Sequence, residues 1–143
     1  MSIRAATTQD LPSIKALLQR YELPTADLDD AHVAFLVDEH DGQVTGAIGL
    51  QRFERVALLR SLAVHASQRG TGAGGGLVLL LEAEARQNGV DELILLTQTA
   101  QAFFAKRGYR VIAREAAPAA VLQTEEFRSL CPASAVCMVK SLL

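Results

Sequence analysis

The chain has 143 residues, half of them apolar, which is enough for one domain with a continuous hydrophobic core. Its 14 basic and 16 acidic residues give a net charge of −2, which argues against a broad nucleic-acid-binding surface. The amino terminus lacks a signal-peptide pattern, and the most apolar short run is too short to span a membrane. The two cysteines, Cys131 and Cys137, do not have a metal-ligand spacing. We therefore expect a single domain over residues 1–143 that is cytoplasmic, with reduced thiols and no metal.

The first part of the chain predicts one helix among four strands. Thr7 or Thr8 can cap a helix that runs to about Arg20 and carries apolar residues at helical spacing. Residues 21–31 are expected to form a loop or a short second helix. Asp41-Gly42 is a strong signal for a type I′ hairpin turn. The four predicted strands are Ser2–Ala5, Val33–Asp38, Val44–Gln51 and Arg55–His65.

The second part of the chain alternates helices with strands. The predicted helices are about Gly74–Gln87, Ala100–Lys106, and one or two turns within Pro118–Leu130, and the predicted strands are Glu92–Thr97, Tyr109–Arg114 and Ala135–Leu142. Hairpins come first and βαβ-like units come later. We therefore expect an α/β (α+β) fold with a mixed sheet and helices on both of its faces.

Glycines crowd the turn that follows the predicted strand Leu58–Val64. Five of them occupy seven positions, namely Gly70, Gly72, Gly74, Gly75 and Gly76. Free N–H groups at a helix start, together with the helix dipole, form an anion site. The missing Cβ atoms let a pyrophosphate approach the backbone closely, and Arg69 can add a charged hydrogen bond. The sequence therefore predicts a pyrophosphate-binding turn.

Three alternatives for this turn fit less well. A P-loop needs a lysine after its glycines, and there is none between Lys15 and Lys106. A dinucleotide-binding fingerprint should follow the first strand of a doubly wound sheet, whereas this turn lies halfway along the chain after a hairpin. A plain glycine-rich turn would destabilise the helix start without a compensating gain.

Three segments at characteristic spacing carry a family resemblance. Arg69–Gly74 has the pattern Arg/Gln-x-x-Gly-x-Gly/Ala, Leu59–His65 is an apolar strand before it, and Ala100–Tyr109 is a Phe-Phe helix ending in Gly-Tyr. Together they resemble the GNAT superfamily of acetyl-CoA-dependent N-acetyltransferases. The resemblance implies the GNAT fold, with a mostly antiparallel sheet of about seven strands and a splay between the two central ones. It also implies transfer of an acetyl group to an amine.

The resemblance further implies how acetyl-CoA, the co-substrate, is bound. A strand backbone should pair with the pantetheine arm, the glycine turn should hold the pyrophosphate, and two aromatic rings should lie near the thioester. For Phe103 a purely structural role in the core is an equal alternative. The implied cofactor-binding residues are Leu62, Ala63, Val64, Arg69, Gly70, Thr71, Gly72, Ala73, Gly74, Gly75, Phe103 and Phe104.

Phe104 departs from the family pattern. In many members a tyrosine at this position protonates the departing thiolate, and phenylalanine has no proton to give. Tyr109 is expected to pack structurally instead. Other hydroxyls or thiols are candidates for this role, without a ranking among Thr97, Thr99, Ser134 and Cys137. The backbone N–H near Leu62 or Val64 is the expected oxyanion donor.

Catalytic and acceptor-binding residues are predicted from their positions near the central strands. Glu54 is assigned as the base, ahead of Glu39, and Ser61 and Thr97 are assigned to both catalysis and acceptor binding. Arg60 lies in an otherwise apolar strand and needs an acidic partner. That partner is either an acid group of the substrate or a buried Asp or Glu.

The segment Thr124–Met138 resembles GNAT proteins associated with arsenic resistance and small acetyltransferases related to N-acetylglutamate synthase. This implies the α-amino group of a small acidic amino acid, or of its arsenical or phosphinic mimic, as the acceptor. Arg60 and Arg128 are then the expected partners of its acid groups. Cys131 and Cys137 are expected to be packed residues rather than arsenic ligands.

Two other functions stay open on the same fold. A non-catalytic acetyl-CoA-binding sensor or partner protein is mildly favoured by Phe104. A protein Nα- or lysine acetyltransferase would need an open groove for its acceptor. The resemblance also implies a homodimer in which the final strand pairs across the interface, while no nucleic acid or membrane partner is expected.

Overall fold

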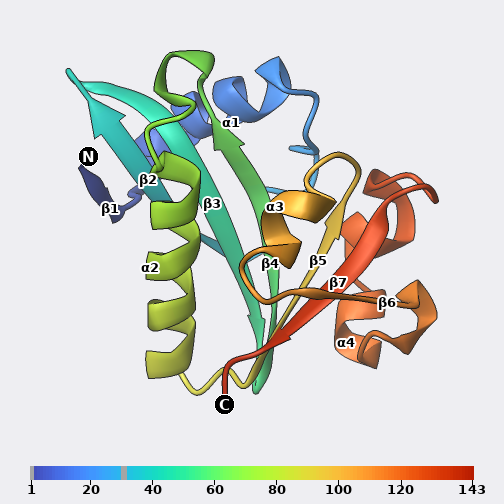
Figure 1. The fold of residues 1–143 in the computed structure, drawn as a ribbon. Coiled ribbons are helices and arrows are strands. Elements are labelled where there is room, and N and C mark those ends of the chain that lie inside the picture. The colour runs from blue at the N-terminus through green and yellow to red at the C-terminus, as the bar shows by residue number, and fades with distance from the viewer. Residues whose placement is uncertain (1, 30–31) are drawn as a thin grey trace.

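One seven-stranded sheet forms the centre of the computed structural model, which describes residues 2–29 and 32–143 (Figure 1). In sheet order the strands are β1 (Ile3–Ala5), β2 (Val33–His40), β3 (Gln43–Phe53), β4 (Val56–Val64), β5 (Glu92–Thr97), β7 (Val136–Ser141) and β6 (Arg110–Ile112). Every neighbouring pair is antiparallel except β4 and β5, which are parallel. The predicted mixed, mostly antiparallel sheet is therefore confirmed.

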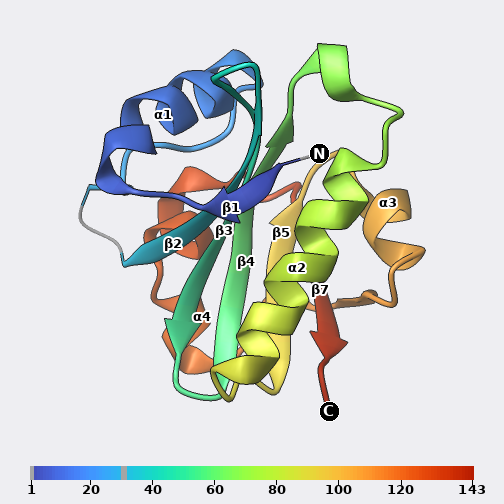
Figure 2. The same ribbon diagram turned by 90° about the vertical axis from the view of Figure 1, so that its left-hand side faces the viewer.

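Helices cover both faces of this sheet, as predicted. The α-helices are α1 (Leu11–Arg20), α2 (Ala73–Gln87), α3 (Gln101–Ala105) and α4 (Ala119–Leu122), and short helices of other types are η1 (Thr8–Asp10), η2 (Ala66–Gln68), η3 (Arg114–Ala116) and the π-helix η4 (Glu126–Leu130). Alternate residues of β3 point to opposite faces, so Ile48 packs with α2 while Ala47 packs with α1. Figure 2 shows α2 in front of the sheet and α4 behind it.

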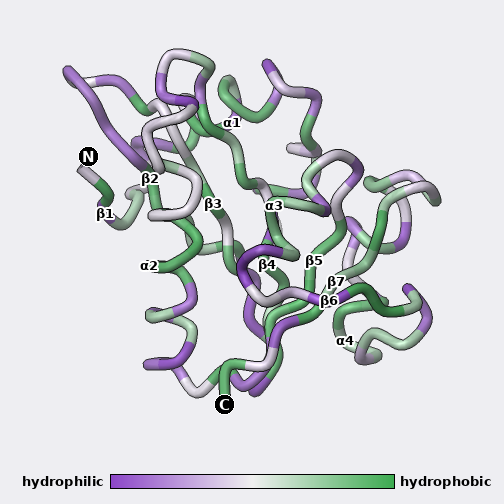
Figure 3. The backbone as a smooth tube through the Cα atoms, viewed as in Figure 1, coloured by the Kyte–Doolittle hydropathy of each residue, from purple (hydrophilic) through white to green (hydrophobic). Residues whose placement is uncertain are grey.

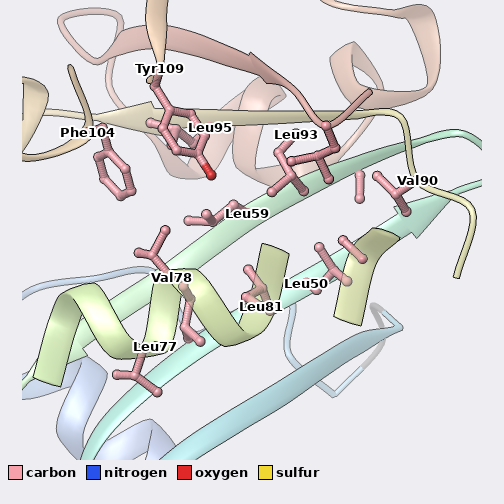
Figure 4. Close-up of a cluster of buried hydrophobic side chains, with 14 of the residues drawn as sticks. Leu50, Leu59, Leu77, Val78, Leu81, Val90, Leu93, Leu95, Phe104 and Tyr109 are labelled. Atoms are coloured by element: carbon pink, nitrogen blue, oxygen red, sulfur yellow. The ribbon is translucent and has the colours of Figure 1, made fainter. Parts of the chain in front are cut away.

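The larger core cluster joins α2 and α3 to the sheet. Leu59 of β4, Leu95 of β5 and Leu81 of α2 converge there, with Phe104 and Tyr109 at one end (Figure 4). The first turn of α2 is nearly white in Figure 3 because glycine has near-neutral hydropathy, whereas the leucine-rich turn after it is green. The glycines are therefore free for a role other than core packing.

Several predicted elements differ from the observed ones. Residues 21–29 form turns and no helix, and the rest of that predicted segment, 30–31, lies outside the described residues. The predicted strand Tyr109–Arg114 is shorter, because Tyr109 turns into the core and η3 begins at Arg114. The one or two helical turns predicted within residues 118–130 are present, as a short α-helix and a π-helix.

The final strand, which was expected to pair across a dimer interface, already has partners on both sides within the chain. β7 lies between β5 and β6, and both of its edges already carry hydrogen-bonded neighbours. A second chain therefore finds no long free edge on β7. Among the described residues, no helix is long and apolar enough to cross a membrane.

The parallel pair at the centre of the sheet separates early. β4 and β5 pair only from Val56 to Leu58, opposite Glu92 to Ile94, and then diverge toward their carboxyl ends (Figure 1). A β-bulge lies just beyond this point: the register of β4 with β3 shifts, and Ser61 has a φ of +59°. A bulge bends a strand and increases its local twist. The splay expected between the two central strands is therefore present.

Candidate active site

A cavity of about 280 Å³ lies where β4 and β5 separate. Its walls come from the turn after α1, the bulge of β4, the end of β5 with α3, and the segment from η4 to Ala135. The lining residues used below are Glu22, Arg60, Ser61, Leu62, Thr97, Thr99, Phe104, Glu126 and Cys131. Segments far apart in the chain thus meet at one enclosed space, which is typical of a small-ligand site.

One edge of β4 is free along this cavity. Pairing with β5 ends at Leu58, while β3 continues to hold the other edge as far as Val64. An extended ligand can add to such an edge like another strand. The carbonyl of Val64 already accepts a hydrogen bond from Arg69 Nε at 3.2 Å, so the free groups begin before this residue.

The glycine turn presents a row of free backbone donors at the start of α2. Gly70 and Gly72 have φ values of +81° and +84°, which L-residues rarely adopt. The N–H of Arg69 donates to the Ala66 carbonyl at 3.3 Å, and the next donor with a backbone acceptor is Gly76, which bonds to the Gly72 carbonyl at 2.9 Å. Within the described chain, the N–H groups from Gly70 to Gly75 have no such acceptor. The turn therefore fits a bound anion.

Two residues that the sequence did not single out support this turn. Arg107 stacks on the Phe103 ring at 3.8 Å, and its guanidinium lies 2.8 Å from where a Cβ at Gly75 would be. Tyr21 accepts a hydrogen bond from the Ala66 N–H at 2.9 Å, and the Arg69 guanidinium lies 4.7 Å from its ring centre. The stacking of Arg107 on Phe103 is local, but the contacts of Arg107 with Gly75 and of Tyr21 with Ala66 join segments distant in sequence, so no local pattern could have indicated them.

Arg60 has found its acidic partner within the protein. Its side chain is fully buried, and its Nη1 and Nη2 donate to the two carboxylate oxygens of Asp27 at 2.7 and 2.8 Å. Its Nε donates to Ser61 Oγ at 3.2 Å and lies 3.7 Å from Glu126 Oε1. The question left open by the sequence is thus answered by a buried aspartate, and the guanidinium is not free for a substrate carboxylate.

Glu126 is the least satisfied member of this cluster. It is 4% exposed, and its Oε2 has no hydrogen-bond partner among the described residues. Burial raises the pKa of Glu126 to about 7, Arg60 opposes this rise, and the negative charge of Asp27 adds to it. Burial and the charge of Glu126 also raise the pKa of the Cys131 thiol to about 12, so Cys131 stays protonated at neutral pH.

Comparison with known proteins identifies the family. The model described as "Acetyltransferase (GNAT) family" matches residues 3–109. The chain belongs to the GNAT acetyltransferase family. It is 27% identical over 120 residues to an amino-acid acetyltransferase of Mannheimia succiniciproducens, covering 76% of this chain and 27% of that protein. It is 33% identical over 116 residues to an amino-acid acetyltransferase of Ralstonia nicotianae, and this match covers 75% of this chain and 26% of that protein. This GNAT chain thus spans about a quarter of the length of these relatives.

Solved structures show the same fold. N-acetylglutamate synthase from Neisseria gonorrhoeae, complexed with coenzyme A and N-acetyl-glutamate, is similar with a TM-score of 0.85 and 24% identity. The match covers 99% of this chain and 35% of that one. Rv2747 from Mycobacterium tuberculosis, in complex with CoA and NLQ, is similar with a TM-score of 0.83 and 26% identity, and each chain is covered completely. The predicted GNAT fold is therefore confirmed.

The cavity brings together several of the predicted site residues of this GNAT chain and separates others from them. Ser61 and Leu62 of β4, Thr97 of β5 and Phe104 of α3 all line it. Thr97 Oγ1 also accepts a hydrogen bond from the Ala100 N–H at 3.0 Å, so its oxygen is held at the end of β5. The geometry therefore keeps these four as candidates.

Glu54, Glu39 and Arg128 lie elsewhere. Glu54 is exposed in the turn between β3 and β4, roughly 15–20 Å along the strand from Ser61. Glu39 lies 3.3 Å from Arg4, near the opposite edge of the sheet. The Arg128 side chain is 64% exposed beside Glu125 and does not line the cavity. The three side chains predicted as base or acceptor ligand therefore do not line this cavity.

Tyr109 has the structural role predicted for it. Its hydroxyl donates to Glu82 Oε2 at 2.8 Å inside the core, and burial raises its pKa. Of the four unranked proton donors, Ser134 and Cys137 do not line the cavity. Thr97 and Thr99 do, so the structure narrows the choice to these two hydroxyls.

Replacing Arg60 tests the buried charge cluster. We expect Arg60→Met to lower the free energy of unfolding by about 3–5 kcal/mol, because it leaves two buried carboxylates without a cation. Arg55→Met is the matched control, since Arg55 is 79% exposed and its ion pair with Asp91 contributes at most about 1 kcal/mol. Urea denaturation of both variants measures the difference, and equal losses would contradict the assignment.

Glu126 predicts a pH-dependent stability. Its pKa of about 7 in the folded state lies above the ordinary value of 4.5, so the folded chain binds the proton more tightly than the unfolded chain. Stability contributed by this residue therefore falls as pH rises from about 5 to 8, by on the order of 3 kcal/mol. In Glu126→Gln this part of the slope should vanish, and a denaturation series across that pH range measures it. Parallel curves for the two proteins would refute the shift.

Proposed function

We propose that this protein transfers the acetyl group of acetyl-CoA to the amine of a small molecule. The observation that carries the proposal is the cavity at the splay of β4 and β5, which lies along the free edge of a strand, β4, that leads into a turn of free backbone donors. Family membership supports the same reaction. The lining comes from four segments and leaves limited space, which suits a small acceptor better than a protein chain.

The residues present fit acetyl-CoA at this site. The free edge of β4 around Leu62 is suited to the amide groups of the pantetheine arm, and the N–H groups from Gly70 to Gly75 to the pyrophosphate. Arg69 and Arg107 supply positive charge on either side of that turn. Phe103, which packs between Gly74 and Arg107, acts through this packing rather than through the thioester.

The bulge of β4 supplies the expected oxyanion donor. Because Ser61 occupies an extra position, the strand beyond it changes phase, and Leu62 turns toward the same core as Leu59. The N–H of Leu62 can then face the open side of β4 and stabilise negative charge on a carbonyl oxygen. For the departing thiolate, Thr97 or Thr99 is the proposed proton donor.

An amino acid is the proposed acceptor class. Curated relatives are amino-acid acetyltransferases, which supports an α-amino group as the acceptor. The charges of the cavity argue for a neutral side chain, since Glu22 and Glu126 are acidic and Arg60 is already paired with Asp27. A side-chain carboxylate, as in glutamate, would add one more negative charge without a cation there and would cost about 1–3 kcal/mol.

A panel of acceptors tests this function through release of the CoA thiol. We expect turnover with amino acids that have neutral side chains, and at least about tenfold lower kcat/KM with glutamate. Phosphinic and arsenical amino acids, polyamines and an amino-terminal peptide complete the panel and test the detoxification and peptide alternatives. Tight acetyl-CoA binding without thiol release from any of them would favour the sensor alternative instead.

Gly72→Glu tests the pyrophosphate turn. The added carboxylate should weaken acetyl-CoA binding by more than about tenfold, because it places a negative charge among the proposed phosphate donors. Gly42→Glu is the control, since Gly42 has a similar φ of +78° and an equally open surrounding but lies in a hairpin turn. Calorimetric titration with acetyl-CoA measures the affinity of both variants. Equal affinities would refute the assignment of the pyrophosphate to this turn.

Three further expectations stay predictions: a single domain over residues 1–143, homodimerisation, and a cytoplasmic location. A dimer would have to use a surface other than the edges of β7, for the reason given above.

A further inference from the structure

We propose that Glu126 takes the proton from the ammonium group of the acceptor. The inference rests on the proposed function and assigns the base that the sequence had placed at Glu54. Glu126 lies on the π-helix η4 and lines the same cavity as Ser61, Leu62 and Thr97. Its Oε2 is buried and has no hydrogen-bond partner among the described residues, and within this cavity cluster it is the one side-chain oxygen in that state.

The buried cluster has one positive charge fewer than it needs to pair both of its carboxylates. Arg60 satisfies both oxygens of Asp27, and the contact of its Nε with Glu126 Oε1 is longer, at 3.7 Å. The buried cluster therefore holds two carboxylates for one guanidinium. An ammonium group entering the cavity would supply the missing positive charge and a donor for Oε2.

The charged and polar groups that face Glu126 bring its pKa close to neutral pH. These groups are Arg60 of β4, Asp27 of the loop before β2, and Cys131, which follows η4 directly. Arg114 of η3 also faces this region, with its Nη2 donating to the Phe127 carbonyl at 2.7 Å. Together with burial they bring the pKa of Glu126 to about 7, where a base is most effective near neutral pH.

In the proposed reaction the acceptor loses two protons, one to Glu126 and one to the thiolate. Glu126 accepts one proton from the ammonium group, which leaves a neutral amine with a free electron pair. The nitrogen then forms a bond to the thioester carbonyl carbon, and the carbon–sulfur bond breaks with its electron pair on sulfur. The second nitrogen proton neutralises the thiolate, and the carboxylic acid returns its proton to water. One ammonium and one thioester give one amide, one thiol and one released proton.

Glu126→Gln tests the proposal with two acceptors. With the amino acid that the wild-type protein turns over fastest, we expect kcat/KM to fall about 100-fold or more and its acidic limb near pH 7 to disappear. Hydroxylamine is a much weaker base and is already neutral near neutral pH, so its kcat/KM should fall less than about tenfold. Glu125→Gln is the matched control, because its exposed side chain does not line this cavity and should leave both rates unchanged.

Each possible result either supports or overturns the role of Glu126 as the base. Equal losses with the two acceptors would show a structural role, and unchanged rates would exclude Glu126 altogether. If the wild-type protein turns over no acceptor, the proposed function fails, and the carboxyl group is then followed by carbon-13 NMR in glutamate-labelled protein. Glu126 should titrate near pH 7 and shift to a lower pKa when ethylammonium is added. A resonance that does not respond to ethylammonium overturns the inference independently.

Discussion

The parallel pairing of β4 with β5 ends after three residues, and both halves of the site depend on this separation. A continuous ladder would occupy the edge of β4 and fill the space beside it with strand. The bulge at Ser61 bends β4 away, while β5 remains paired along its whole length with β7. One local irregularity thus yields a free strand edge for the cofactor and a cavity for the acceptor.

The second constraint is the buried guanidinium of Arg60. A fully buried cation is costly unless its hydrogen bonds are met, and Asp27 meets them from a loop that carries no regular structure. This ion pair ties the loop to β4 and, because Glu126 lies 3.7 Å from Arg60, η4 is held close to the same guanidinium. If Glu126 is the base, as proposed, stability depends on the same three side chains as the reaction, so changes that relieve the charge imbalance should stabilise the fold at the expense of the reaction.

The sequence was informative where local patterns decide structure. The Asp41-Gly42 turn, the glycine-rich start of α2 and the buried strand β5 follow from backbone conformation and short-range periodicity, and each is present. Nearness along the chain does not imply nearness in space. Glu54 lies in the turn before β4, whereas Glu126, the base proposed above, lies sixty-six residues after Arg60, in the third helical segment after α3, and approaches Arg60 to 3.7 Å. Tyr21 and Arg107 were missed for the same reason. No local pattern distinguishes them from ordinary surface residues.

Because Phe104 has no proton to donate, this site has one proton-transfer group fewer than a family member with a tyrosine at that position. The ammonium group of the acceptor must lose two protons before the amide is complete, and the ring of Phe104, packed edge-on between Phe103 and Tyr109, can transfer neither. A base of near-neutral pKa removes the first proton before attack, which Glu126 is suited to do. The second is then strongly acidic on the charged nitrogen of the intermediate and can pass to the thiolate through Thr97, Thr99 or a water molecule. Loss of the tyrosine is therefore compatible with catalysis, provided that the base is present.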